Sequence, residues 1–129
     1  MDIQHVPAMP AFADRFGYSQ AKRIGPCIAL SGTPPRDAEG RVVGQGDVYA
    51  QALQVLENVR DSLRQLGAGP EHVLRSRVYL TDMAHVWDIG RAHLAFYGES
   101  LPAVALVKVP QFFDPEILVE MDADAWLPN

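Results

Sequence analysis

Three acidic side chains alternate along one apolar segment late in the chain. In ILVEMDADAW, residues 117–126, Glu120, Asp122 and Asp124 stand two positions apart with apolar residues between them. On a β-strand, next-but-one side chains lie about 7 Å apart on the same face, which allows coupled titration or a shared divalent ion. The same spacing is typical of a solvated or salt-bridged strand face, and this is the simpler interpretation.

Glu120 differs from the two aspartates because it lies deepest in the apolar part of this segment. Burial disfavours the charged form of a carboxyl group, so it would raise the pKa of Glu120 and suit this group to proton transfer. Glu120 is therefore the best single candidate for acid–base chemistry. The basic residues that could neutralise the acidic strand across a sheet are Arg75, Arg77 and Lys108, and such pairs contribute little where water reaches them.

The other reactive side chains give weaker signals. Cys27 is the only cysteine, which excludes an intrachain disulfide, and in the apolar segment PCIAL a buried, inert thiol is the simpler interpretation. The four histidines lack the i, i+4 spacing of a zinc-binding helix. We therefore expect no metal site and no cofactor. His93 falls in an apolar helical stripe, which favours a core histidine bonded to a carbonyl over a catalytic base.

Size and charge restrict the classes of function. With 129 residues, 48% of them hydrophobic, the chain fits a single domain over residues 1–129. The net charge of −5 and the scattered lysines and arginines argue against nucleic acid as a partner. No apolar run approaches the roughly 18–20 residues that span a bilayer. The first residues lack the basic and apolar regions of a secretory signal, so we expect a cytoplasmic protein without a membrane partner.

The first half of the chain predicts a hairpin and a helix. Residues 17–32 read as two strands around the turn at Gly25, and the proline- and glycine-rich loop that follows has room for a short strand at 41–43. A helix then begins after Asp47, a good N-cap, and ends before Gly67, which can adopt the left-handed conformation. The apolar side of this helix is formed by Ala52, Leu53, Val55, Leu56, Val59, Leu63 and Leu66.

The second half predicts a strand, a helix and two further strands. Alternation over Val73–Leu80 places Leu74, Ser76, Val78 and Leu80 on one face. Thr81 or Asp82 caps a helix at 83–97, and strands follow at 103–109 and 117–126. Both helices are apolar along one side only, so we expect them to pack on one face of a mixed sheet. The other face needs a cover that this chain does not supply, which predicts self-association.

Taken in order, these segments resemble the reactive intermediate deaminase family, the RidA or YjgF type, whose members are also called L-PSP endoribonucleases. The segment YSQAKRIGPCIALSGTPP resembles the opening hairpin of that family, which ends in an SGQ-P turn. The segment QALQVLENVRDSLRQLGAGPEHVLRSRVYLTDM resembles its first helix, loop and central strand, and HLAFYG, PAVALVKV and ILVEMDADA resemble its closing elements. The resemblance covers nearly the whole chain, and the segments are specific when taken together.

The resemblance implies a fold, an assembly and an activity. The fold would be α+β and chorismate-mutase-like, with a mixed six-stranded sheet and two helices on one face. The assembly would be a homotrimer whose sheets close a central barrel and cover the open sheet face. In the clefts between subunits, family members hydrolyse enamines or imines from amino-acid metabolism to a 2-oxo acid and ammonia. An essential arginine there holds the substrate carboxylate through a bidentate pair.

The position of that arginine carries a different residue in this chain. The family pattern resembles PARS, whereas this chain reads PAVA over residues 102–105, so Val104 stands where the arginine is expected. Losing a bidentate, partly desolvated charge pair costs roughly 2–5 kcal/mol for a carboxylate ligand. The turn glutamine, the helix asparagine and a small residue on the strand are replaced by Thr33, Gly90 and Leu106.

Other cleft residues of the family are present. The ligand-binding residues that the resemblance implies are Tyr18, Ser31, Gly32, Val104, Ala105 and Leu106. Glu120 occupies the position that, in active members, is thought to position the attacking water. A cleft that keeps this acid and lacks the anion anchor suggests a neutral or apolar ligand, or a hydrolysis with other substrate demands.

Two hypotheses on function remain open. In the first, which we favour, the protein is a trimeric binding module that holds a small uncharged metabolite in its apolar cleft or acts as a chaperone-like partner. In the second, it is a divergent enamine or imine deaminase, a hydrolase in which Glu120 uses a bound water while Tyr18 and Ser31 orient the substrate. Nuclease action rests on the family name, and the acidic composition argues against it. Arg91 could enter the cleft and restore anion binding, although an exposed helical arginine is the simpler interpretation.

Overall fold

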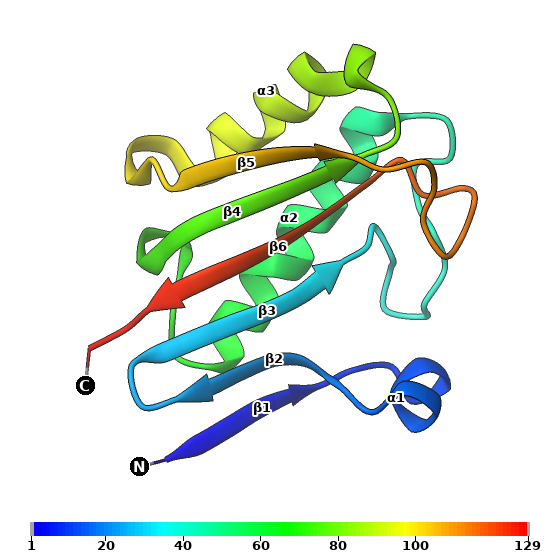
Figure 1. Ribbon diagram of the computed structural model, residues 1–129. Coiled ribbons are helices and arrows are strands. Elements are labelled where there is room, and N and C mark those ends of the chain that lie inside the picture. Colours follow the sequence, from blue (N-terminus) through cyan, green and yellow to red (C-terminus); the bar gives the residue numbers. More distant parts are fainter. Residues whose placement is uncertain (1, 129) are drawn as a thin grey trace.

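The structure, a computed structural model, describes residues 2–128 and contains a six-stranded sheet with helices (Figure 1). The strands are β1 (Ile3–Pro7), β2 (Ser19–Ile24), β3 (Cys27–Thr33), β4 (Val73–Leu80), β5 (Ala103–Lys108) and β6 (Val119–Trp126). The helices are α1 (Pro10–Phe16), α2 (Val48–Gln65) and α3 (Val86–Tyr97), with short 3-10 turns at Pro70–His72, Met83–His85 and Gly98–Ser100. The strand order is β1-β2-β3-β6-β4-β5, and only the β4–β5 pair is parallel. The expected mixed α+β sheet is therefore confirmed.

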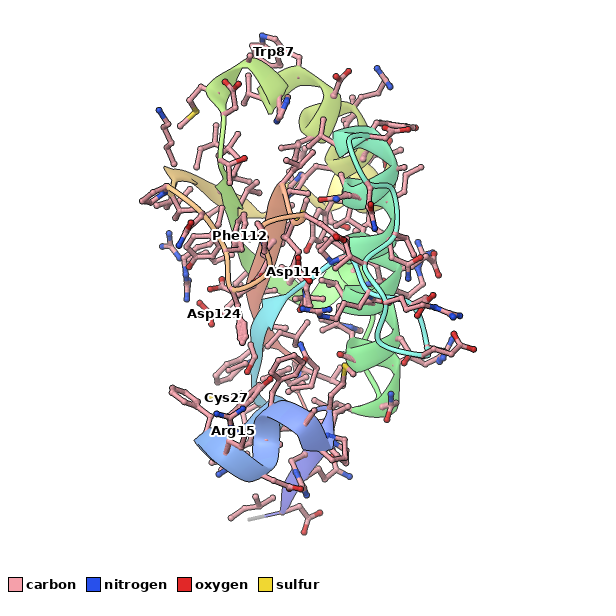
Figure 2. All side chains as sticks on the ribbon, turned by 90° about the vertical axis from the view of Figure 1, so that its right-hand side faces the viewer. Arg15, Cys27, Trp87, Phe112, Asp114 and Asp124 are labelled. Carbon is pink, nitrogen blue, oxygen red and sulfur yellow. The ribbon has the colours of Figure 1, made fainter. Side chains whose placement is uncertain are left out.

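Helices α2 and α3 pack on one face of the sheet and leave the other face open. The alternation along β6 is confirmed: Val119 and Met121 are buried under the helices, whereas Asp124 lies on the side away from them (Figure 2). Cys27 is exposed, so the expectation of a buried thiol is wrong for the single chain. Cys27 is the first residue of β3, and only every second side chain at the start of this strand faces the core. In the described part of the chain, no helix has the length and apolar character needed to cross a membrane.

The helix α2 begins and ends as its sequence indicates. The Asp47 side chain accepts a hydrogen bond from the Ala50 amide at 3.1 Å, and Gly67 adopts a left-handed conformation with φ of 84°. The predicted apolar side is buried except for Leu53, which is 43% exposed. That assignment was wrong because Leu53 lies at the margin of the helical stripe, between the buried Ala52 and the half-buried Gln54.

The strand β4 contains an irregularity that the alternation did not reveal. The pairing of β4 with β6 shifts between Val73 and Arg75, so Val73 is buried and Leu74 is 60% exposed. The predicted face of β4 is therefore wrong at Leu74 and right from Ser76 onward, because a bulge reverses which side chains face the core. The helix predicted at 83–97 begins as the 3-10 turn Met83–His85 and continues as α3 from Val86. Asp82 caps the turn by accepting a hydrogen bond from the Ala84 amide at 2.9 Å.

The N-terminal elements β1 and α1 were not predicted. The sixth strand of the sheet is β1, which pairs with β2, whereas the expected strand at 41–43 is reduced to a single bridge between Arg36 and Val42. β1 carries only one buried side chain, Val6, so it has little periodic signal. None of the residues of α1 is buried, and Gly17 ends this helix with φ of 81°.

His93 is half-buried beside the core, and its partner is a hydroxyl group in place of the expected carbonyl. His93 Nε2 is 2.9 Å from Ser76 Oγ, and the His93 ring lies 4.6 Å from the ring of Tyr97. Burial lowers the pKa of His93 and raises the pKa of Tyr97 to about 12. The lowered pKa favours the neutral form of the half-buried His93 at pH 7.

A histidine with a lowered pKa predicts loss of stability in acid. Below pH 6.5 the unfolded chain takes up the proton before folded His93 does, so the free energy of unfolding should fall as the pH drops from 6.5 through the folded pKa. Urea unfolding at pH 7.5 and 5.5 measures this. The fall should be smaller for His93→Gln than for the wild type. An equal fall in both proteins would show that His93 does not cause it.

Candidate functional site

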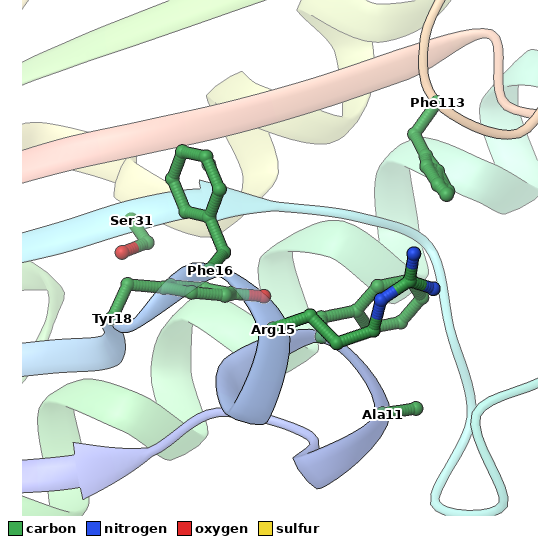
Figure 3. Close-up of a pocket in the computed structure, with 8 residues that line it drawn as sticks. Ala11, Arg15, Phe16, Tyr18, Ser31 and Phe113 are labelled. Atoms are coloured by element: carbon green, nitrogen blue, oxygen red, sulfur yellow. The ribbon is translucent and has the colours of Figure 1, made fainter.

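A pocket of about 810 Å³ opens at the end of the sheet where α1 meets β2 and β3 (Figure 3). Its lining residues are Ala11, Phe12, Arg15, Phe16, Tyr18, Ser31, Gly32 and Phe113. Three of the site residues expected from the sequence, Tyr18, Ser31 and Gly32, therefore lie together. The aromatic rings come from three separate segments, which are α1, the short link between α1 and β2 that contains Tyr18, and the loop before β6.

Local contacts hold the walls of this pocket in place. The Ser31 hydroxyl donates a hydrogen bond of 2.6 Å to the carbonyl of Ser19, which ties β3 to β2. The rings of Phe12 and Phe113 meet edge to face at 5.5 Å, and those of Phe16 and Tyr18 meet at 6.0 Å. Large apolar side chains that stay exposed around a concavity are typical of ligand or partner surfaces.

A second hollow of about 150 Å³ lies beside the pocket and leads to Glu120. It shares Phe12, Tyr18, Gly32 and Phe113 with the larger pocket. Its other lining residues are Met9, Gln20, Pro34, Arg36, Ile117 and Glu120. The structure thus brings Glu120 together with Tyr18, Ser31 and Gly32, which are four of the residues named from the sequence.

Gly32 allows the closest approach between the two strands that carry these groups. A Cβ atom at this position would lie 3.1 Å from Glu120 Oε1, tighter than ordinary van der Waals contact. Any larger side chain at position 32 would therefore press on the carboxyl group. The requirement for glycine comes from this close approach, because the backbone of Gly32 is not in the left-handed region.

The environment of Glu120 raises the pKa of its carboxyl group. Burial raises the pKa of Glu120 above its ordinary value, and the positive charge of Arg36 opposes this effect only in part. A carboxyl group with a raised pKa can exchange a proton with a bound molecule near neutral pH more readily than an ordinary glutamate. The direction of the shift is the one expected from the apolar sequence around Glu120.

Glu120 should cost the protein stability at neutral pH. The pKa of Glu120 is higher in the folded protein than the unfolded value of 4.5, so the folded state holds the proton more tightly. The free energy of unfolding is therefore highest below pH 4.5 and falls as the pH rises through the folded pKa. We therefore expect Glu120→Gln to have a higher free energy of unfolding than the wild type at pH 7, with a gap that closes below pH 4.5. Urea unfolding at both pH values measures the gap.

Glu116→Gln is the matched control, because Glu116 is exposed and lies in the same chain segment. It should change the free energy of unfolding by less than about 0.5 kcal/mol at either pH. A loss of stability in Glu120→Gln at pH 7 would contradict the assignment, since it would show that the ionised carboxylate is well solvated or paired in the folded protein.

The two aspartates on β6 do not belong to the pocket. Arg77 Nε lies 3.1 Å from Asp122 Oδ1, and an Arg77 terminal nitrogen lies 2.9 Å from Asp124 Oδ2. The Tyr79 hydroxyl also donates to Asp122 Oδ2 at 2.8 Å. The salt-bridged interpretation of the acidic strand is therefore confirmed for Asp122 and Asp124, with Arg77 as the partner, whereas Glu120 faces the hollow beside the pocket. Among the described residues, no group of three histidine, cysteine or acidic side chains could hold a metal ion.

The expected cleft residues on β5 lie far from this pocket within one chain. Glu120 pairs with Tyr79 on β4, which pairs with Val107 on β5, and Val104 lies three residues further along. Strand spacing and rise place Val104 about 14 Å from Glu120. Val104 and Leu106 are 47% and 49% exposed at the edge of the sheet. Ala105 lies between them on the same edge strand.

The remaining expected positions are also outside the pocket. Thr33 is buried and accepts a hydrogen bond from Gln20 Nε2 at 3.2 Å. Gly90 lies on α3. Arg91 pairs with Asp88 at 3.3 Å and stacks over the Tyr49 ring at 4.0 Å, on the helical surface.

The sequence did not predict several residues that line the site. The rings of Phe12, Phe16 and Phe113 lie in α1 and in a loop, where no periodic pattern marks them, and Arg36 lies in the loop between β3 and α2. The sequence offered one signal, which is the pair of phenylalanines four residues apart just before Tyr18.

Comparisons with known proteins agree on one family. The family model described as Endoribonuclease L-PSP matches residues 9–127. A RutC family protein of Pyrococcus abyssi is 33% identical over 84% of this chain and 85% of its own length. The crystal structure of a YjgF/YER057c/UK114 family member from Mycobacterium tuberculosis has a TM-score of 0.88 and 32% identity, and covers 98% of this chain and 100% of that one. The YjgF gene product of Escherichia coli has a TM-score of 0.81 and 26% identity, over 95% and 93%. The chain therefore belongs to the endoribonuclease L-PSP family, which is the RidA/YjgF family that its segments resemble.

Proposed function

We propose that this protein is a homotrimer that binds a small metabolite in clefts between subunits, without the imine deamination that depends on an arginine at position 104. One chain supplies the pocket with Tyr18, Ser31, Gly32 and Glu120. The neighbouring chain supplies the edge strand β5 with Val104, Ala105 and Leu106.

One observation carries this proposal. The residues that match the family's cleft fall into two groups, and the structure places them on separate parts of the sheet, with Val104 about 14 Å from Glu120. A site that needs both groups can form only between copies of the chain. The exposed apolar side chains Val104, Leu106 and Val107 on the edge strand give that contact a hydrophobic surface.

The chemistry of the cleft follows from its walls. Aromatic rings and a valine side chain favour the apolar body of a ligand, because such surfaces gain free energy when water leaves them. The edge strand offers no guanidinium group at position 104 to hold a carboxylate. The larger pocket should therefore hold the apolar body of the ligand, while polar groups, among them Tyr18, Arg36 and Glu120, line the hollow beside it.

A second function is favoured by the raised pKa of Glu120. In a divergent enamine or imine deaminase, Glu120 would take a proton from a water molecule as that water attacks the C=N carbon. Glu120 would return this proton to the nitrogen, which completes a carbinolamine. The proton of the new hydroxyl group would then pass to the nitrogen as the C–N bond breaks, so that the products are a carbonyl compound and ammonia. Tyr18 and Ser31 would orient the substrate, and no metal or cofactor is needed for this step.

The proposed assembly is tested by a pair of leucine substitutions. Light scattering should give the wild type about three times the 14.2 kDa mass of one chain. Leu106→Asp places a charge on the edge strand and should dissociate the trimer. Leu94→Asp is the control, since Leu94 is 67% exposed on α3 and lies outside the proposed contact. A wild-type monomer, or equal behaviour of the two variants, would contradict the proposal.

Ligand binding is tested with the same proteins. Small aromatic compounds such as phenylacetamide and phenylacetate should shift the NMR signals of Tyr18, Ser31 and Gly32 in the wild type and in Leu94→Asp. The shifts should weaken in Leu106→Asp, which lacks the second wall. Shifts that appear only outside the pocket would contradict a ligand site at this position.

A further inference from the structure

Arg36 is a cation inside the site that neither the sequence nor the family resemblance singled out. Its side chain is 15% exposed and lines the hollow that contains Glu120, Tyr18 and Phe113. It comes from the loop between β3 and α2, so it belongs to the same chain as Glu120 and does not depend on the edge strand.

The loop holds Arg36 in a fixed position. The Asn58 side chain on α2 donates hydrogen bonds to the carbonyls of Pro34 at 3.0 Å and Arg36 at 2.9 Å. Asp37 Oδ1 accepts from the backbone amides of Glu39 at 3.0 Å and Arg41 at 2.9 Å, which closes the following turn. A side chain on such an anchored backbone is preorganised, so that little ordering is needed when it binds a ligand.

The guanidinium group of Arg36 retains donors for a ligand. One terminal nitrogen donates to the Gly40 carbonyl at 3.0 Å and lies 3.9 Å from Asp114 Oδ2, while the group stacks 5.4 Å from the centre of the Phe12 ring. A guanidinium group has five N–H donors. Within residues 2–128, the structure gives Arg36 one hydrogen bond through its side chain and no ion pair with Glu120.

The second wall of the hollow is compatible with an anion. Burial raises the pKa of Glu120. In its protonated form this carboxyl group would donate a hydrogen bond to a ligand carboxylate, which an ionised carboxylate would repel. The hollow of about 150 Å³ has room for a carboxylate group, and it opens beside the larger aromatic pocket.

We propose that Arg36 binds the anionic group of the ligand, so that the ligand is a small carboxylate whose flat apolar body lies against Phe12, Tyr18 and Phe113. This inference rests on the proposed ligand cleft and adds the substrate class and the residue that selects it. The carboxylate is held from the wall that carries Glu120, whereas an arginine at position 104 would approach from the opposite wall.

A purely structural role for Arg36 is the competing explanation. Its contacts with the Gly40 carbonyl and Asp114 could serve only to fix the loop. That role would make Arg36 important for stability, but it would not make the protein distinguish a carboxylate from an amide of the same shape.

Phenylacetate and phenylacetamide separate the two explanations, because they have the same shape and differ at one end, where a charged carboxylate replaces a neutral amide. We expect the wild type to bind phenylacetate at least about tenfold more tightly, as a charge-assisted hydrogen bond provides. The preference should disappear in Arg36→Met and persist in part in Arg36→Lys, which keeps the charge. Arg41→Met is the control, since Arg41 is 74% exposed in the same loop and should leave the preference unchanged. Titration calorimetry gives the two dissociation constants.

Each outcome decides one proposal. Equal affinity of the wild type for both compounds, with NMR shifts at Tyr18 and Gly32, would overturn the role of Arg36 and leave the cleft intact. An unchanged preference in a folded Arg36→Met, verified by its thermal unfolding, would also overturn it. If neither compound shifts any signal of the pocket, the ligand cleft itself is refuted.

Discussion

Replacing Val104 by arginine is expected to give the protein a hydrolytic activity on 2-iminopropionate that the wild type lacks. A bidentate arginine–carboxylate pair in a partly desolvated site contributes roughly 2–5 kcal/mol, which corresponds to a gain of about 30- to 5000-fold in kcat/KM. Val104 is 47% exposed at the sheet edge in the single chain, so the longer side chain should not disturb the core. The imine is generated in place from alanine by an amino-acid oxidase, and its hydrolysis is followed as loss of a trapped adduct.

The control for this prediction is Val104→Met, which has a long but uncharged side chain. It should stay at the wild-type level. 2-Iminopropionate is a suitable probe because it has no apolar body for the aromatic walls, so its binding depends on its carboxylate. Arg36 holds this group from one wall only, and an arginine at position 104 would hold it from the other as well. Wild-type hydrolysis at a rate that Val104→Arg does not exceed would show that the charge at position 104 is not what the reaction lacks.

Gln51→Leu is expected to lower the free energy of unfolding by about 2–5 kcal/mol. Gln51 is fully buried on α2, where its Nε2 donates to the carbonyl of Glu116 at 2.9 Å and its Oε1 accepts from the amide of Leu118 at 2.8 Å. The side chain thus pairs with the backbone that enters β6 and leads to Glu120. Leucine has a similar volume but leaves both buried backbone groups without a partner, and each costs about 1–3 kcal/mol.

Urea unfolding measures this loss, and Gln54→Leu is the matched control. Gln54 lies one turn later on α2, is half-buried and bonds only to Asn58 among the described residues, at 3.0 Å. Its replacement should cost less than about 1 kcal/mol. Equal losses of unfolding free energy in the two variants would show that the hydrogen bonds of Gln51 to Glu116 and Leu118 do not stabilise the protein more than the bond of Gln54 to Asn58 does.

The fold could be predicted from the sequence where local signals agree with burial. Asp47 and Gly67 delimit α2 because capping and the left-handed turn are properties of a few neighbouring residues. The alternation of β6 is visible because one of its faces packs under helices. The bulge at Val73 was not predicted, because it depends on pairing with a strand distant in the sequence. The strand β1 was not predicted, because it buries only Val6 and so has no clear alternation.

Only part of the candidate site could be predicted from the sequence. Glu120 could be found because an acid inside an apolar strand is unusual in any sequence. Arg36 and Phe113 could not, because both lie in loops, and only the folded chain brings them to Glu120. The placement of Val104 is also a property of the sheet, since the strand order puts β5 at the edge away from the pocket.

A crystal structure of the assembled protein would show directly what completes the pocket around Glu120. We expect three copies around one axis, with Val104 of the partner subunit lining the hollow that contains Glu120 and Tyr18. A monomer, or an assembly through another face that leaves Val104 in water and the pocket open, would contradict both the shared cleft and the role given to position 104.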